Sequence, residues 1–331
     1  MREWTDNFTR IFEKYMFAII PGTLLIGFLL SDQLIDYAGW IPYLFAYVTF
    51  VMGIGCGRRH VQGVLRRPLP VIITLLVTHL VAPLFAYELG QLMFGPDSPY
   101  TIGLVLFTAI PLGVSSVLWV SMSSGNVALA LAMVIVDSAI SPFVVPGLIE
   151  LFFGTGVHFD TLGMIRDLML IIVLPTMLGM IVYEVSGGRF KPWSAPVTLP
   201  LSKLCFIGVV LLNAAAIAPQ LHELKGDLLV VVPSVLIIVA LCYGLGYVCS
   251  GILRAKGLEL PATLAYASGM RNISVGMVIA MSYFTPQAAV PVVLGIMLQQ
   301  PMATLQYSIF VRVAAYRSKQ RLKEANYIKG D

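Results

Sequence analysis

The chain has 331 residues, of which 58% are hydrophobic and 11% are charged, and its mean hydropathy is +0.87. Because a soluble globular domain carries about 25% charged residues, this composition excludes a water-soluble domain and predicts an all-α integral membrane protein. The formal net charge of +4 comes from basic residues in short loops, so no nucleic-acid partner is expected.

Apolar stretches follow one another along the chain with short polar connections. A membrane-spanning helix needs roughly 20 mostly apolar residues. On this criterion the sequence predicts ten transmembrane helices, in chain order 15–31, 38–56, 69–94, 101–122, 126–153, 161–186, 198–218, 227–252, 259–284 and 286–314.

The loops between these spans differ in charge from one side to the other. One set of loops carries most of the basic residues: Arg2, Arg10, Lys14, Arg58, Arg59, Arg66, Arg67, Arg189, Lys191, Lys203, Arg254, Lys256 and the tail after residue 311. The other set carries Arg166, Lys225, Asp32, Asp36, Asp97, Asp160, Glu223 and Asp227. Because cytoplasmic loops are enriched in Lys and Arg, both termini are predicted to lie in the cytoplasm, with the multi-pass protein in the plasma or inner membrane.

The fourth and ninth spans contain helix-breaking residues. Span 4 includes "AIPLGVSSV" (109–117) and span 9 includes "YASGMRNISVG" (266–276). Pro111 removes a backbone donor, and Gly113 and Gly269 permit unusual dihedral angles. The breaks fall at matching places in two five-span halves, 1–157 and 158–331, which is the inverted-repeat layout of secondary transporters. Two ordinary kinks with small residues for packing are the alternative.

Several stretches resemble the bile acid:sodium symporter family. They are "FVMGIGCG…VLRRPLP" (50–70), "HLVAP" in span 3, "IPLGVSSVLWVSMSSGNVALALAM" (110–133) and "SGMRN" in span 9, and together they cover nearly the whole chain. The resemblance implies a ten-helix inverted repeat, with a panel domain from spans 1, 2, 6 and 7 and a core domain from spans 3–5 and 8–10. Spans 4 and 9 would unwind and cross. The substrates implied are organic anions such as bile acids, steroid sulfates or small carboxylates, usually carried with two sodium ions.

The residues that would bind sodium depart from the family pattern. Ala267 matches the family's sodium-binding glutamate, Arg271 matches a glutamine, and Thr78 matches another glutamine in span 3. Ala130 and Val134 stand where span 5 would offer hydroxyl groups. Side-chain oxygens remain at Ser116, which Val117 follows in place of an asparagine, and at Ser268. Because a hard cation prefers several oxygens including a carboxylate, the usual two-sodium coupling is not expected, and sodium, a proton or uncoupled transport stay open; no cofactor is expected.

Arg271 lies between apolar stretches. An isolated charge at the bilayer centre costs at least about 2.5–3.5 kcal/mol on insertion scales, so a partner is expected, and Asp137 in span 5 is the candidate. Arg271 and the half-helix N-termini would then form a positive pocket for a substrate carboxylate or sulfate, with Asp137 exchanging a proton. A purely structural pair joining spans 5 and 9 is the alternative.

Other polar groups in the spans are candidates for the same site. A lone histidine such as His79 is more often a packed polar residue than a proton relay. The remaining candidates are Thr78, Ser115, Ser116, Ser268, Met270, Asn272 and Gln299.

The predicted function is secondary transport of an organic anion by alternating access. No HExxH, GxSxG or CxxC motif occurs, and no enzyme activity is expected. Two alternatives remain: a sodium-independent efflux or facilitative carrier related to the arsenite and auxin carriers, and a non-transporting receptor that retains the fold. Membrane lipid is a possible partner of the basic tail, and the oligomeric state stays open.

Overall fold

The computed structural model describes residues 2–58, 62, 68–96, 98–154, 159–223, 226–255 and 257–328. Within these ranges the chain is built from helices, and its β-contact is one isolated bridge, so the all-α expectation is confirmed. The predicted boundary between residues 157 and 158 lies outside the described residues. So do the loop residues Arg59, Arg66, Arg67, Asp97, Lys225 and Lys256.

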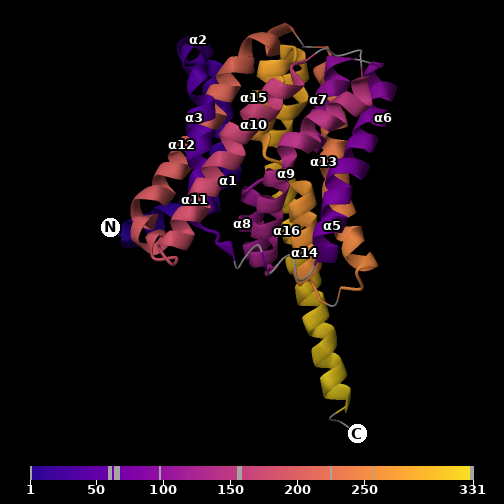
Figure 1. Cartoon of the computed structure of the whole chain (residues 1–331). Helices are drawn as coiled ribbons and strands as arrows, with labels where there is room; N and C mark the ends of the chain where they lie inside the picture. Colours follow the sequence, from indigo (N-terminus) through magenta and orange to yellow (C-terminus); the bar gives the residue numbers. More distant parts are fainter. Residues whose placement is uncertain are drawn as a thin grey trace.

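The first part of the chain runs up and down through the molecule (Figure 1). Its elements are α1 (Arg2–Leu29), α2 (Ser31–Leu34), the 3-10 turn η1 (Ile35–Trp40), α3 (Ile41–Ile54), α5 (Pro68–Leu76), the π-turn η2 (Val77–Val81), α6 (Ala82–Phe94), α7 (Pro99–Ala109), α8 (Ser115–Met122) and α9 (Val127–Phe153). Because α5, η2 and α6 are continuous, they form one long apolar run.

The second part is also built from long helices and from one pair of short ones, α14 and α15, which corresponds to the pair α7 and α8 in the first part. Its elements are α10 (Thr161–Leu168), the π-turn η4 (Met169–Val173), α11 (Leu174–Val185), α12 (Phe190–Glu223), α13 (Leu228–Ile252), α14 (Glu259–Gly269), α15 (Ile273–Tyr283) and α16 (Pro286–Ile328).

Among the residues that the structure describes, seven helical runs are long and apolar enough to cross a membrane. They are Ser31–Ile54, Pro68–Phe94, Val127–Phe153, Thr161–Val185, Phe190–Pro219, Leu228–Ile252 and Pro286–Tyr316. The apolar helices Ala18–Leu29 and Pro99–Ala109 are shorter. Predicted spans 4 and 9 each consist of two short helices, which is why neither reaches the full length in one piece. The chain is therefore a multi-pass membrane protein.

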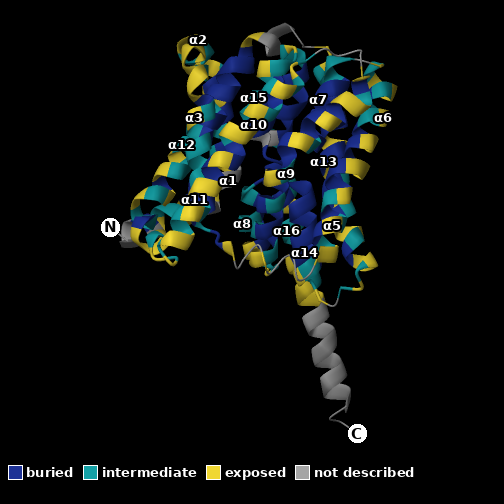
Figure 2. Cartoon of the chain, viewed as in Figure 1, coloured by how far each residue is buried: buried dark blue, intermediate teal, exposed yellow. Residues whose placement is uncertain are grey.

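The helices gather into two groups. In one group α12 packs against α1 and α3, and α3 also packs against α11; in the other, α7 packs against α6 and α16, and α13 packs against α14. The groups lie on opposite sides of the view in Figure 1. Figure 2 shows exposed residues along the outer faces of the helices and buried residues between them. An interface between two helix groups is where a bundle can hold a ligand.

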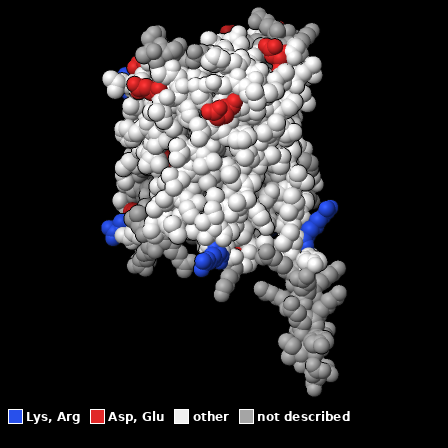
Figure 3. All heavy atoms as spheres, turned by 90° about the vertical axis from the view of Figure 1, so that its right-hand side faces the viewer, with Lys and Arg blue, Asp and Glu red and all other residues white. Residues whose placement is uncertain are grey.

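Charged side chains occupy the two ends of the molecule. On the face in Figure 3, acidic residues lie toward one end, basic residues lie toward the end from which α16 projects, and a broad band with few charges separates them. The beginning of α1 and the end of α16 lie toward the same end (Figure 1). This distribution matches the charge difference between the two sets of loops.

Candidate functional site

The two interrupted spans cross and pair with each other. Helix α7 ends at Ala109 and α8 begins at Ser115, while α14 ends at Gly269 and α15 begins at Ile273. The segments between them form an antiparallel bridge of Leu112 with Arg271. The N–H of Gly113 donates to the carbonyl of Met270 at 2.8 Å, and the N–H of Asn272 donates to the carbonyl of Pro111 at 2.8 Å. Backbone groups that the breaks release from helices are thus satisfied inside protein, as membrane depth requires.

Pro111 and two glycines shape this crossover, although not all for the predicted reason. Ile110 is extended, with ψ 152°, as expected for a residue that precedes proline. Neither Gly113 nor Gly269 has a positive φ, so the prediction of unusual dihedral angles is wrong. Both glycines instead allow close approach: a Cβ on Gly113 would lie 2.8 Å from the carbonyl oxygen of Arg271, and one on Gly269 would collide with the ring of Tyr243.

Asp137 on α9 is fully buried and forms a hydrogen bond with the backbone of the first break. Its Oδ2 accepts a hydrogen bond from the backbone N–H of Leu112 at 2.6 Å, and its Oδ1 is in hydrogen-bond contact with Nε2 of His79. The predicted ion pair of Asp137 with Arg271 is therefore wrong. The carboxylate is directed at the main chain of the first break, whereas the arginine side chain extends from the second break toward α13.

Arg271 is the largest side chain among those that are fully buried, with 1% of its surface exposed. Its Nη2 lies 4.0 Å from the sulfur of Cys242 on α13, which is a weak contact. Its Nε and Nη1 have no hydrogen-bond partner among the described residues. Its main chain is held by Gln299, whose Oε1 accepts from the Arg271 N–H at 3.1 Å. The guanidinium therefore retains donors that fit a carboxylate or sulfate.

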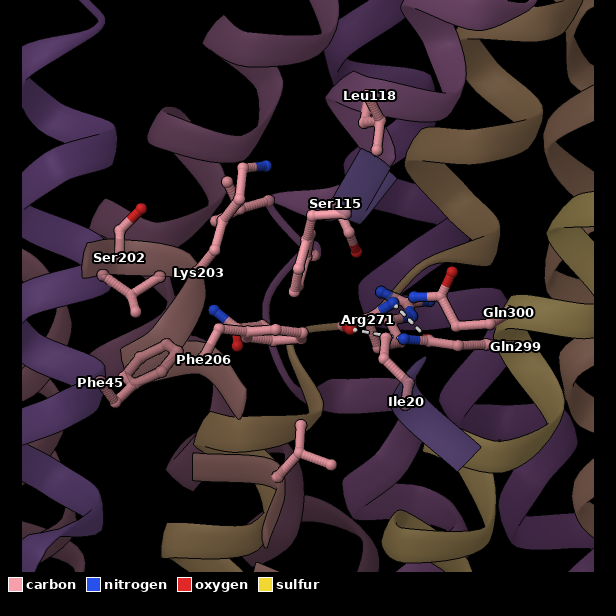
Figure 4. Close-up of a pocket in the computed structure, with 16 residues that line it drawn as sticks. Ile20, Phe45, Ser115, Leu118, Ser202, Lys203, Phe206, Arg271, Gln299 and Gln300 are labelled. Carbon is pink, nitrogen blue, oxygen red and sulfur yellow. Dashed lines mark hydrogen bonds between the residues drawn. The ribbon is translucent and has the colours of Figure 1, made fainter. Parts of the chain in front are cut away.

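A cavity of about 230 Å³ lies at the crossover, between the two helix groups. In Figure 4, Phe45, Ser202, Lys203 and Phe206 lie on one side of the cavity, and Arg271, Gln299 and Gln300 lie on the other. Further lining residues come from α1, α3, α8, α12 and the two breaks: Phe12, Ile20, Val48, Gly113, Val114, Ser115, Leu118, Val210 and Asn272. The rings of Phe45 and Phe206 on one side are thus accompanied by the polar Ser202 and Lys203, and the other side carries the polar Arg271, Gln299 and Gln300.

The structure brings some of the predicted site residues together and separates others. Ser115, Arg271, Asn272 and Gln299 line the cavity. The other candidates are buried but do not line it: Thr78, His79, Ser116, Asp137, Ser268 and Met270.

The candidate sodium ligands have different surroundings. The hydroxyls of Ser116 and Ser268 are buried and have no hydrogen-bond partner among the described residues. The Thr78 hydroxyl donates to the carbonyl of Leu75 at 3.2 Å, within its own helical run. Two hydroxyls therefore remain where sodium ligands were predicted, and position 267, where the family has a glutamate, is an alanine.

Several residues at the site were not singled out from the sequence, among them Gln300, Lys203 and Cys242. Gln300 lines the cavity and accepts a hydrogen bond from Nε1 of Trp119 at 3.1 Å. Lys203 also lines it, with Nζ 5.0 Å from the ring centroid of Phe12, although the sequence had indicated a loop position for this lysine. Cys242 contacts Arg271. Gln300 directly follows Gln299, which was a candidate from the sequence.

Comparisons with known proteins identify the family. Residues 42–221 match the Sodium Bile acid symporter family. The Bacillus subtilis protein YbaS, which is described as uncharacterized, is 34% identical over 287 residues, covering 87% of this chain and 94% of YbaS. The YocS protein of the same organism, described as an uncharacterized sodium-dependent transporter, is 25% identical and covers 81% of each chain.

A plant protein is also similar to this chain. The rice chloroplastic protein BASS1, described as a probable sodium/metabolite cotransporter, is 26% identical over 249 residues, covering 74% of this chain and 59% of BASS1. The family match includes the first break and the cavity-lining helices α3, α8 and α12, whereas α1, the second break and α16 lie outside it. The chain therefore belongs to the sodium bile acid symporter family and is a membrane transporter, not an enzyme.

Proposed function

We propose that this protein is a secondary transporter that moves an organic anion across the cytoplasmic membrane by alternating access, with the anion bound at Arg271. The observation that carries the proposal is the buried guanidinium beside the cavity, whose Nε and Nη1 lack a partner among the described residues. A buried charge without a counter-ion is costly. An anionic ligand would supply that counter-ion and would accept both donors.

The cavity supports a small organic acid as the substrate. Its volume of about 230 Å³ lies below the range of about 300–1,000 Å³ that is common for pockets of drug-sized ligands. The charged group would lie against Arg271 and Gln299, and an apolar body would contact Phe45 and Phe206 on the opposite wall. A bile acid or a steroid sulfate would require a wider conformation of the same cavity.

The proposed architecture is a ten-helix inverted repeat with halves 1–157 and 158–331. The panel domain would consist of spans 1, 2, 6 and 7, and the core domain of spans 3–5 and 8–10. The cavity lies between helices assigned to these domains, so a movement of one domain against the other would open it to each side in turn. The predominance of basic residues at one end supports cytoplasmic termini.

The coupling ion is the second part of the proposal. Sodium is favoured by the descriptions of the YocS and BASS1 relatives, and Ser116 and Ser268 would be its side-chain ligands. A proton or no coupling ion is favoured by the absence of a carboxylate at position 267. An efflux carrier would show the same anion site with outward net flux, whereas a receptor would bind the anion without moving it.

Transport into proteoliposomes tests the proposal. Uptake of labelled pyruvate, taurocholate and a steroid sulfate is measured with sodium, with potassium and with an imposed pH gradient. Arg271→Gln is compared with Arg312→Gln, which removes the same charge from an exposed position outside the cavity. We expect uptake of at least one anion by the wild type and by Arg312→Gln, and its loss in Arg271→Gln. Equal uptake by both variants would contradict the role of Arg271, and binding without uptake would favour a receptor.

A further inference from the structure

The cavity lies on one side of the crossover. The break residues and α8 line it, whereas none of its lining residues, among those that the structure describes, belongs to α7, α10 or α15. Helix α8 lies toward the end from which α16 projects, and α7, α10 and α15 lie toward the opposite end, where acidic residues gather (Figures 1 and 3). The anion site therefore adjoins the basic half of the molecule, and α10 and α15 belong to the acidic half.

A hydrogen bond joins α10 to α15 in the acidic half. The hydroxyl of Tyr283, the last residue of α15, donates to Oδ2 of Asp167 on α10 at 2.6 Å. Gly163 on α10 lets the phenol approach, since a Cβ there would lie 3.3 Å from its oxygen. The rings of Phe159, just before α10, and Phe284, just after α15, pack with their centroids 5.7 Å apart. A polar contact and an aromatic contact thus hold the same two segments together.

The packing between α10, η4 and α15 leaves very little space. A gap of about 10 Å³ lies there, compared with about 230 Å³ for the cavity. Asp167 and Tyr283 border the gap, and its other lining residues are apolar, such as Leu168 and Ile279. The gap is too narrow for an anion that fills the cavity, so these helices separate the anion site from the acidic end in this conformation.

Another hydrogen bond between a tyrosine and an aspartate provides a comparison. The hydroxyl of Tyr100, near the start of α7, donates to Oδ2 of Asp227, which directly precedes α13, also at 2.6 Å. Helices α7 and α13 belong to spans 4 and 8, which are both assigned to the core domain. Helices α10 and α15 belong to spans 6 and 9, which are assigned to different domains. Of these two bonds, Tyr283–Asp167 is therefore the one that crosses the interface between the domains.

We propose that Tyr283 and Asp167 form a latch that closes the acidic end of the transport path in the conformation seen here. This inference rests on the proposed function, because it assigns α10 and α15 to two domains that move against each other. For the anion site to open toward the acidic end, α15 has to separate from α10, so the hydrogen bond breaks in every transport cycle. The two side chains are positioning groups that do not touch the anion, and their bond favours the closed conformation over the open one.

A reversible cross-link tests the latch in proteoliposomes. Asp167→Cys combined with Tyr283→Cys is treated with a bifunctional methanethiosulfonate reagent, and Tyr100→Cys combined with Asp227→Cys is the matched control with the same native cysteines. With an anion that the wild type accepts, we expect the first cross-link to abolish uptake until dithiothreitol releases it. The control cross-link, which joins helices of one domain, should leave uptake unchanged. Uptake that survives the first cross-link, once mass spectrometry has verified it, would overturn the latch while leaving the proposed function intact.

A second measurement does not depend on any substrate. Ile279, which is 2% exposed beside the latch, is replaced in Ile279→Cys, and the rate of labelling by a membrane-impermeant maleimide is compared with that of the chain without this change. Adding Tyr283→Phe should raise the rate about tenfold, since losing a hydrogen bond to a charged group shifts an equilibrium by at least about that factor.

Adding Tyr100→Phe instead should leave the labelling rate unchanged, because that bond lies within one domain. Equal rates with and without Tyr283→Phe would overturn the latch. If Tyr283→Phe raises the rate and no anion is moved under any condition, the proposed function fails and the latch between α10 and α15 stands.

Discussion

Asp137 contacts one of the two paired breaks and Arg271 belongs to the other, and the two side chains differ in how many of their polar atoms have a hydrogen-bond partner in the protein. Both oxygens of Asp137 accept hydrogen bonds, from Leu112 and His79. Two nitrogens of Arg271 have no partner among the described residues. Because leaving a buried charge unpaired is costly, the comparison identifies the carboxylate as an internal anchor, and it is the reason why we propose the guanidinium as the ligand-binding group.

The largest expected effect comes from removing the anchor. Asp137→Ala leaves His79 and the N–H of Leu112 without their acceptor, and breaking a buried pair costs about 3–5 kcal/mol. Thermal unfolding in detergent should show a strongly lowered midpoint. Asp137→Asn retains an acceptor oxygen and should lower it less. If both variants unfold like the wild type, the carboxylate is not an anchor.

Arg271→Gln should affect transport rather than stability. It removes a charge that has no counter-ion among the described residues, so the unfolding midpoint should stay the same or rise. A hydrogen bond to a charged group contributes about 1.5–3 kcal/mol, so uptake at limiting anion concentration should fall about tenfold or more. Arg271→Lys keeps the charge without the planar fork and should recover part of the uptake. A lowered midpoint in Arg271→Gln would assign the arginine a structural role.

Gly113→Ala tests whether the two segments must stay in contact. The added Cβ would lie 2.8 Å from the carbonyl oxygen of Arg271, a backbone atom that cannot rotate away, and such overpacking typically costs about 1–3 kcal/mol. Gly147→Ala on α9 is the matched control, since nothing lies within 4 Å of its Cβ position. We expect lower stability and slower uptake in the first variant and neither in the second. If Gly113→Ala is as stable and as active as Gly147→Ala, the two paired segments do not need to stay in close contact.

The smallest effect is expected at Gln299 on α16. Its neutral side chain accepts from the backbone of the second break, as the Asp137 carboxylate does from that of the first. Its side chain accepts from the N–H of Arg271 at 3.1 Å, and a neutral hydrogen bond contributes about 1 kcal/mol. Gln299→Met should therefore lower the unfolding midpoint slightly and weaken uptake less than Arg271→Gln does. An effect as large as that of Asp137→Ala would mean that both breaks depend equally on side-chain anchors.

The positions of several helices and of the two breaks could be predicted from local patterns, whereas α1, α12 and α16 extend well beyond the predicted spans 15–31, 198–218 and 286–314. Predicted span 5, 126–153, matches α9 at Val127–Phe153, and predicted span 8, 227–252, matches α13 at Leu228–Ile252. The first break falls at Pro111 because proline ends a helix at the preceding residue. The second break has no proline, and Gly269 indicated it through a dihedral argument that proved wrong.

The sequence by itself determined a multi-pass membrane protein with two interrupted spans, because hydropathy and helix-breaking residues act over one helix length. The tertiary structure decided which charged groups meet. Asp137 and Arg271 were each recognisable as costly intramembrane charges, but the partner of each depends on how α9 is rotated and on where two segments distant in the chain pair. Those contacts placed Asp137 against His79 and Leu112, and left the arginine beside the cavity with donors for a ligand.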